Sequence, residues 1–204
     1  MHIAEGVLDA PTLIAAASFT TIGIAIGLRQ LTPQMLPSAA LFAAVFFLVG
    51  TIHIPIGVGS VHLILNGLIG LLLGWLAFPV LFVALALQAL LFSFGGFTAL
   101  GANTLLMALP AVVAGLLLRP FLKRYSSSPR TLMTIGALAA TIGIVGATGL
   151  AALMLWSTGR EALLGLVTLL AAAQTPVWII DAIVTALAVS MLGRARPKIF
   201  TFDQ

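Results

Sequence analysis

The fold is decided by residues 61–78, which read VHLILNGLIGLLLGWLAF and contain no Asp, Glu, Lys or Arg. An uncharged apolar run of about 18 residues is long enough for an α-helix to cross the hydrocarbon core of a bilayer. Comparable runs lie on both sides of it, separated by proline, glycine or charged residues. They cover residues 11–28, 36–51, 80–94, 104–118, 132–156 and 177–192. The sequence therefore predicts about seven transmembrane helices.

The composition excludes a soluble protein. Of the 204 residues, 61% are hydrophobic and 7% are charged, and the mean hydropathy is +1.23, whereas soluble domains carry about 25% charged residues. We expect an all-α integral membrane protein that forms a single transmembrane domain over residues 1–204, with no room for a separate catalytic domain. Cysteine is absent, so the chain offers no disulfide and no thiolate ligand.

The placement of the basic residues predicts the orientation in the membrane and is not a sign of nucleic-acid binding. With seven spans, eight of the nine Lys and Arg residues fall in connections on one side, and only Arg160 falls on the other. The eight are Arg29, Arg119, Lys123, Arg124, Arg130, Arg194, Arg196 and Lys198. Cytoplasmic connections are enriched in Lys and Arg, so we expect the N-terminus outside and the C-terminus in the cytoplasm.

This topology assigns a side to each connection. Loops 53–62 and 95–103 lie on the outer side, and residues 119–130 form a basic cytoplasmic loop. The stretch 162–173 is apolar but too short to cross a bilayer. We interpret it as a re-entrant or interfacial helix, and the alternative is that it joins residues 177–192 in one kinked helix.

Residues 1–6 read MHIAEG and belong to a candidate metal-binding segment at residues 1–10. Acidic residues before the first span and a basic residue after it are the reverse of a signal peptide, so we expect this terminus to be retained. Its amine, the His2 amide nitrogen and the His2 Nδ1 could close five- and six-membered chelate rings around one metal ion. Such a nearly planar set suits Ni(II) or Cu(II) better than Zn(II). The alternative is that His2 lies in a frayed terminus.

All three histidines of the chain fall on the predicted outer side. His62 opens the third span and could supply a fourth nitrogen to the planar set, although a histidine at a helix start can simply act as a hydrogen-bonding group there. His53 is the rival ligand. It ends the second span, where an interfacial histidine needs no special role.

Four polar residues in or next to the spans need an explanation. Asn66 and Gln88 are typical of side chains that hold helices together by hydrogen bonds, and the alternative is that they orient an imidazole. Asn103 is a plausible helix cap. Asp181 must be paired, protonated or functional if it is inside the membrane, unless it reaches the outer interface.

The chain resembles the CbiM/NikM family in MHIAEG at residues 1–6, SVHLILNG at 60–67, QALLF at 88–92, GG at 95–96 and GAN at 101–103. Members of this family are the substrate-capturing membrane components of energy-coupling-factor transporters for cobalt and nickel. The resemblance covers the chain to about Pro110. It implies that Met1, His2 and His62 hold Co2+ or Ni2+, which is the transported substrate and not a cofactor.

The same resemblance implies a multi-pass protein of the inner (plasma) membrane that is a transporter subunit and no enzyme. Its partners would be a transmembrane coupling subunit, two cytoplasmic ATPase subunits and often a small accessory membrane subunit. His53 is not part of the family pattern that carries over. From the residues themselves, the candidates for support of the site or its loops are His53, Asn66, Gln88 and Asn103.

Two other functions remain open from the residues themselves. Small residues at helix-packing spacings, such as Gly136 and Gly143, form faces that could dock another membrane protein, so a scaffold or assembly protein without a ligand is the main alternative. An intramembrane enzyme is disfavoured, because only Asp181 lies within the spans as a possible catalytic acid.

Overall fold

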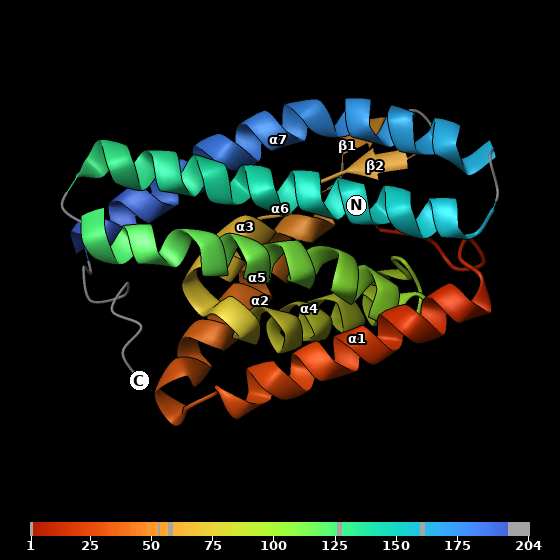
Figure 1. Ribbon diagram of the computed structural model, residues 1–204, viewed down its shortest axis with the longest axis horizontal. Coiled ribbons are helices and arrows are strands. Elements are labelled where there is room, and N and C mark those ends of the chain that lie inside the picture. The colour runs from red at the N-terminus through yellow and green to blue at the C-terminus, as the bar shows by residue number, and fades with distance from the viewer. Residues whose placement is uncertain (1, 53, 57–58, 126–127, 160–161, 196–204) are drawn as a thin grey trace.

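The chain folds into long helices joined by short connections (Figure 1). The computed structural model describes residues 2–52, 54–56, 59–125, 128–159 and 162–195. The elements are α1 (Ala10–Arg29), η1 (Pro33–Met35), α2 (Leu36–Thr51), β1 (Ile54–Ile56), β2 (Gly59–Val61), α3 (Asn66–Leu73), η2 (Gly74–Leu76), α4 (Ala77–Phe92), α5 (Leu100–Tyr125), α6 (Pro129–Ser157) and α7 (Ala162–Ala195).

Six helical stretches of the described chain are long and apolar enough to cross a membrane. They are Ala10–Arg29, Pro33–Thr51, Asn66–Phe92, Leu100–Leu122, Pro129–Ser157 and Ala171–Ala195. The all-α membrane fold is therefore confirmed. A small antiparallel hairpin, in which Ile54 pairs with Val61 and Ile56 with Gly59, is the one departure from it in the described residues. The number of seven spans and the orientation in the membrane stay predictions.

The third and fourth predicted spans divide at a different residue from the one expected. The sequence placed the break at Pro79, but Pro79 lies in the first turn of α4. The N–H groups of the first turn have no hydrogen-bond partner within the helix, so proline, which lacks an N–H, is tolerated there. The chain turns instead at Gly74, whose φ is +59°. Helix α3 has eight residues, about 12 Å at the α-helical rise, so it cannot span a bilayer alone.

A distant arginine explains where α3 ends. Arg119 on α5 donates from its Nε to the carbonyl oxygen of Leu71 at 3.0 Å, and a positive charge stabilises the C-terminus of a helix. A Cβ on Gly74 would lie 2.6 Å from Nη1 of Arg119. The glycine therefore allows both the turn and the approach of the guanidinium group.

Two connections are more helical than the sequence indicated. Helix α5 continues to Tyr125, so the predicted loop at residues 119–130 is reduced to the few residues before α6. Charged residues end an apolar run but do not end a helix, which can project beyond the bilayer. Residues 162–173 are the first part of α7, which runs through Pro176. The joined helix that we kept as the alternative is thus the observed one, and the re-entrant interpretation is wrong.

The core is built around α3, all of whose residues are buried. Glycines bring its backbone against its neighbours: a Cβ on Gly67 would overlap the backbone of Ala139 on α6, and one on Gly70 would overlap that of Ala111 on α5. Between α6 and α7, a Cβ on Gly136 would lie 2.7 Å from the Cα of Ala186. Small residues let membrane helices pack this closely, so they form internal contacts.

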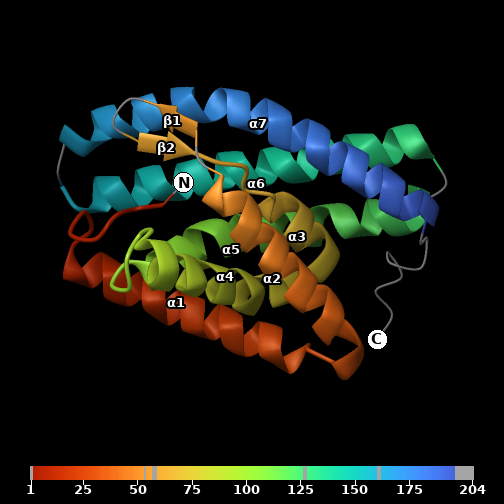
Figure 2. The same ribbon diagram turned by 180° about the vertical axis from the view of Figure 1, so that it is seen from behind.

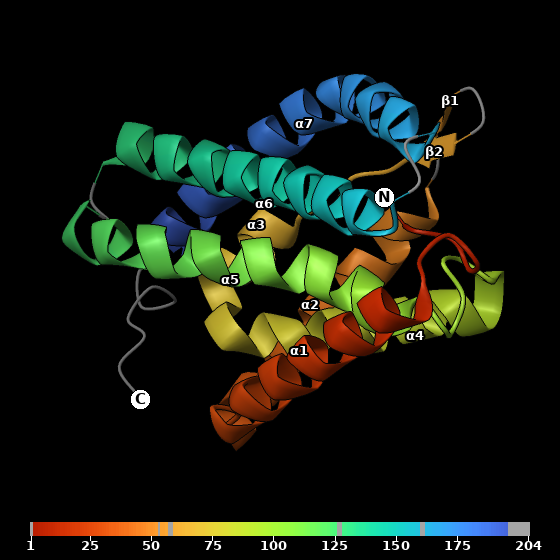
Figure 3. The same ribbon diagram turned by 45° about the vertical axis from the view of Figure 1, so that its right-hand side comes forward.

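The first two spanning stretches, Ala10–Arg29 and Pro33–Thr51, are the most exposed, with 22% and 17% of the residues buried in an 18-residue apolar segment of each. Figure 2 shows α1 at the edge of the bundle opposite α7. Figure 3 shows the N-terminal segment, the β1–β2 hairpin and the connection between α4 and α5 at one end of the bundle. The two described histidines come from this end.

Candidate metal site

The N-terminal segment before α1 is fixed to the bundle by a buried asparagine. Asn103, in the first turn of α5, accepts the N–H of Ile3 at its Oδ1 (2.8 Å) and donates from its Nδ2 to the carbonyl oxygen of Ile3 (3.0 Å). The side chains of Ile3 and Leu8 are buried. The segment is therefore ordered from its second residue onward, which argues against a frayed terminus.

The glycine-rich connection after α4 completes this attachment. Thr98 donates from both its N–H (2.9 Å) and its hydroxyl (3.0 Å) to Oε1 of Glu5. The hydrogen bond from the Thr98 backbone, with that from its side chain, holds the pKa of Glu5 below its usual value. A Cβ on Gly96 would overlap the Glu5 side chain, and one on Gly95 would lie 2.5 Å from Nδ2 of Asn103. These glycines leave the space that the N-terminal segment occupies.

The His2 ring is oriented by Gln88 on α4. The amide nitrogen of Gln88 donates to the carbonyl oxygen of Phe47 at 3.2 Å, so the amide oxygen faces the other way, 3.0 Å from Nε2 of His2. An amide oxygen can only accept a hydrogen bond, so Nε2 of His2 must carry the proton. In the neutral ring the lone pair is then on Nδ1, the nitrogen that the predicted chelate requires.

The His62 ring has the opposite tautomer. Its Nδ1 lies 2.8 Å from the carbonyl oxygen of Leu63, so Nδ1 must be the donor. The neutral ring therefore has its lone pair on Nε2. The His62 side chain is buried, and its ring centre lies 5.1 Å from that of His2. The structure thus places two imidazoles beside each other, each with its protonation fixed by an oxygen atom that can only accept a hydrogen bond.

An aromatic wall borders the pair of imidazoles. The ring of Phe94 lies 6.2 Å from that of His2 and stacks on Phe92 at 5.4 Å, which in turn stacks on Phe47. Next to it, Gly50 lies so close to Gln88 that a Cβ would overlap the amide nitrogen.

The connector from His62 to α3 is also held by buried polar groups. Asn66 donates from Nδ2 to the carbonyl oxygens of Met107 (3.0 Å) and Gly143 (3.2 Å), and its Oδ1 accepts the N–H of Gly67 (2.9 Å). Asn66 thus joins α3 to α5 and α6, the structural role that the sequence favoured.

The remaining predicted residues differ in outcome. Met1 and His53 lie outside the described residues. Gln88 contacts both the His2 ring and the Phe47 carbonyl of α2, so it makes the two kinds of contact that the sequence suggested. Asn103 was expected to cap a helix, but its side-chain amide binds Ile3 because α5 already begins at Leu100. Asp181 is fully buried within the bundle.

Sequence reasoning missed three contributors. They are Glu5, Thr98 and Gly50, to which the sequence analysis assigned no role in the site. Only the position of Glu5 in the MHIAEG motif could have indicated its role. Each contact joins segments far apart in the chain, so local sequence carries no signal for the partner.

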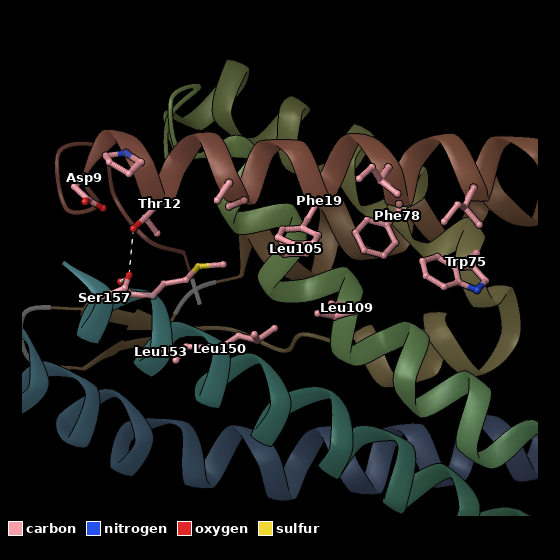
Figure 4. A pocket seen from close by; sticks show the side chains of 17 residues that line it. Asp9, Thr12, Phe19, Trp75, Phe78, Leu105, Leu109, Leu150, Leu153 and Ser157 are labelled. Atoms are coloured by element: carbon pink, nitrogen blue, oxygen red, sulfur yellow. Dashed lines mark hydrogen bonds between the residues drawn. The ribbon is translucent and has the colours of Figure 1, made fainter. Parts of the chain in front are cut away.

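The described residues contain no group of three His, Cys, Asp or Glu side chains that could hold a metal ion. Two imidazoles alone are a small donor set, and further nitrogens would have to come from the backbone at the N-terminus. A groove of about 700 Å³ lies elsewhere, between α1 and α6 (Figure 4). Its lining is apolar except at one end, where Thr12 and Ser157 bond at 3.1 Å, so it offers no metal site.

Comparison with known sequences identifies the family. The family model described as cobalt uptake substrate-specific transmembrane region, CbiM, matches residues 2–199. A putative metal transport protein of Haemophilus influenzae is 48% identical over 200 residues, which cover 98% of this chain and 96% of that protein. A fused nickel transport protein NikMN of Rhodobacter capsulatus is 40% identical over 122 residues, which cover 56% of this chain and 35% of that protein.

A solved structure has the same architecture. The crystal structure of a truncated transition metal transporter matches with a TM-score of 0.65 at 26% identity, covering 96% of this chain and 99% of that chain. The relatives are named as transport proteins, in line with the prediction of a transporter component. The resemblance seen in the sequence motifs is confirmed, and the chain belongs to the CbiM family of substrate-specific transmembrane components for cobalt and nickel transport.

Proposed function

We propose that this chain captures Co2+ or Ni2+ for an ATP-driven importer of the energy-coupling-factor type. The ligands are the Met1 amine, the His2 amide nitrogen, His2 Nδ1 and His62 Nε2. The observation that carries the proposal is the pair of ring tautomers. Gln88 and the Leu63 carbonyl each bind the ring nitrogen that is not required for the metal, and such hydrogen bonds fix the orientation of metal-binding histidines.

The spacing of the rings supports a shared metal ion. The amine, amide and Nδ1 take three corners of a plane, so the fourth corner is adjacent to Nδ1. With metal–nitrogen bonds of about 2 Å, two imidazoles on adjacent corners have ring centres about 4.5 Å apart. The observed 5.1 Å is within a small adjustment of that value. Mg2+ and Ca2+ prefer oxygen ligands and are rejected by an all-nitrogen set.

The energy for import comes from partner proteins in this proposal. The sequence has no nucleotide-binding loop of the P-loop type. A transmembrane coupling subunit, cytoplasmic ATPase subunits and a small accessory membrane subunit, as the family resemblance implies, would complete the transporter. The metal site faces the outside of the inner membrane, as the distribution of basic residues predicts.

Blocking the terminal chelate tests the proposal. A Gly-Ser extension ahead of Met1 moves the amine away from His2, and the matched control carries the same two residues after Gln204. We expect the N-terminal extension to remove Ni2+ and Co2+ binding in calorimetric titrations while leaving the thermal stability of the metal-free protein unchanged. Equal affinity in both extended proteins would disprove the ligand set. If the unextended protein shows neither bound metal nor a thermal shift with either ion, the scaffold function is favoured instead.

A further inference from the structure

Asp181 is a fully buried carboxyl group inside α7, and it is only partly satisfied. Its Oδ1 accepts the N–H of Leu65 at 3.2 Å. Its Oδ2 has no hydrogen-bond partner among the described residues. A carboxyl group within a membrane helix is costly to keep, and this one makes a single bond, to the backbone of another segment. Because of this hydrogen bond to Leu65, Asp181 does more than fill space between helices.

The residue that Asp181 binds adopts an unusual conformation. Leu65 has a φ of +50° and immediately precedes α3. A non-glycine residue in this region is strained and persists only where its surroundings hold it. Leu65 is buried, and a buried N–H without a partner is strongly unfavourable. Asp181 therefore stabilises both the N–H and the bend that presents it.

This bend lies three residues after His62. The ring of His62 binds the carbonyl oxygen of Leu63 within the same connector, so the direction of the ring follows the path of residues 62–65. At the far end, Asn66 fixes the start of α3. The connector is thus held at its end by α5 and α6, and at its bend by α7.

We propose that Asp181 is a positioning residue for the metal site, holding the bend at Leu65 so that Nε2 of His62 faces His2. This inference rests on the proposed function, because it takes His62 as a ligand. It makes α7 part of the site, although α7 supplies no ligand. The consequence is that metal affinity depends on a carbonyl oxygen at position 181 and not on the charge of the carboxylate.

Three variants separate positioning from packing. Asp181→Asn keeps an oxygen that can accept the N–H of Leu65, and its amide group can donate toward Thr185, whose buried hydroxyl has no partner among the described residues. Asp181→Leu has a similar volume and no acceptor. Thr185→Val is the matched control, since it removes another buried polar group from α7, one whose hydroxyl makes no hydrogen bond to the connector among the described residues.

The probe is Cu2+, which favours planar nitrogen sites and whose paramagnetic resonance spectrum reports the number of bound nitrogens. We expect Asp181→Leu to weaken Cu2+ binding by about 10- to 100-fold and to give the spectrum of His62→Ala, with one nitrogen fewer than wild type. Asp181→Asn and Thr185→Val should keep the wild-type spectrum and affinity. A purely structural role would lower the thermal stability of Asp181→Leu but leave the spectrum of its folded fraction unchanged.

Several outcomes would overturn the inference. A wild-type spectrum from folded Asp181→Leu would do so, as would a spectrum from Asp181→Asn that lacks one nitrogen. If Asp181→Leu does not fold, Asp181→Glu decides, because its longer side chain moves the acceptor and should also detach His62; a wild-type spectrum there contradicts positioning. Failure of the proposed function is distinct, since wild type itself would then bind no Cu2+ or its spectrum would not change in His62→Ala.

Discussion

Asn103 binds both backbone groups of Ile3, accepting its N–H at 2.8 Å and donating to its carbonyl oxygen at 3.0 Å across 100 residues of sequence. An extended segment usually pairs its backbone N–H and carbonyl groups with a neighbouring strand. At Ile3, one side-chain amide makes both of these hydrogen bonds instead. Since Ile3 directly follows His2, the contact limits where the imidazole of His2 can lie. The site is therefore assembled by attaching a terminus and not by a preformed pocket.

Removing this attachment should weaken metal binding without removing a ligand. Asn103→Leu leaves the N–H and carbonyl of Ile3 unpaired, at about 1–3 kcal/mol for each buried group, so the segment should detach in a large share of molecules. We expect at least a tenfold loss of Ni2+ affinity by titration calorimetry. The control is Gln174→Leu, which removes a buried amide from a different helix, α7, and it should bind Ni2+ normally. Comparable losses in both variants would mean that general destabilisation is responsible.

The position of Gln88 can be tested through a glycine. Gly50→Ala introduces a methyl group that overlaps the Gln88 amide nitrogen, so the amide must leave the Phe47 carbonyl and the His2 ring. Gly149→Ala is the control, because its added Cβ meets nothing within 4 Å. Both changes raise helix propensity, by up to about 1 kcal/mol. We expect weaker Ni2+ binding only in Gly50→Ala, and equal affinities would show that Gln88 does not orient His2.

The choice between the two loop histidines gives a direct contrast. His62→Ala removes the proposed fourth nitrogen and should lower Co2+ and Ni2+ affinity strongly, whereas His53→Ala should change it little. Metal content of the purified proteins, each with an unmodified N-terminus, is the measurement. The reverse result would assign the ligand to His53, which lies outside the described residues.

The contact between Glu5 and Thr98 should make the order of the N-terminal segment sensitive to acid. The pKa of Glu5 is lowered in the folded protein by the hydrogen bonds from Thr98, so its contribution is complete above the ordinary value near 4.5 and is lost as the pH falls through the lowered pKa. Hydrogen-exchange protection of the Thr98 amide should fall across that window. In Glu5→Gln this extra pH dependence should disappear, and its persistence would point to another titrating group.

The sequence was informative where the signal was local and weak where contacts were distant. Apolar runs and small-residue spacings predicted a membrane-embedded helical bundle, and the motifs from Met1 to Asn103 predicted the family. The break at Gly74 was missed because it depends on Arg119, 45 residues further along the chain. The continuity of α7 was uncertain because Pro176 favours a break that the surrounding helix packing overrides.

The candidate site shows the same division. The sequence was sufficient to select four residues of the site, namely His2, His62, Gln88 and Asn103. It could not show which groups these side chains bind. The partner of Asn103 is the backbone of Ile3, and that of Gln88 includes the carbonyl of Phe47. Backbone groups have no identity in a sequence, so no residue type marks them as partners. The ligand assignment itself stays a prediction.

The Phe47 carbonyl has a consequence for which amino acid can occupy position 88. Because a carbonyl can only accept, it forces Gln88 to present its nitrogen to α2 and its oxygen to His2. An ionised glutamate of the same shape would face the carbonyl with a second acceptor and be repelled by it, and a glutamate could serve both neighbours only while its carboxyl group is protonated. The site thus requires a group with a donor at one end and an acceptor at the other, which an amide provides at any pH that the cell meets.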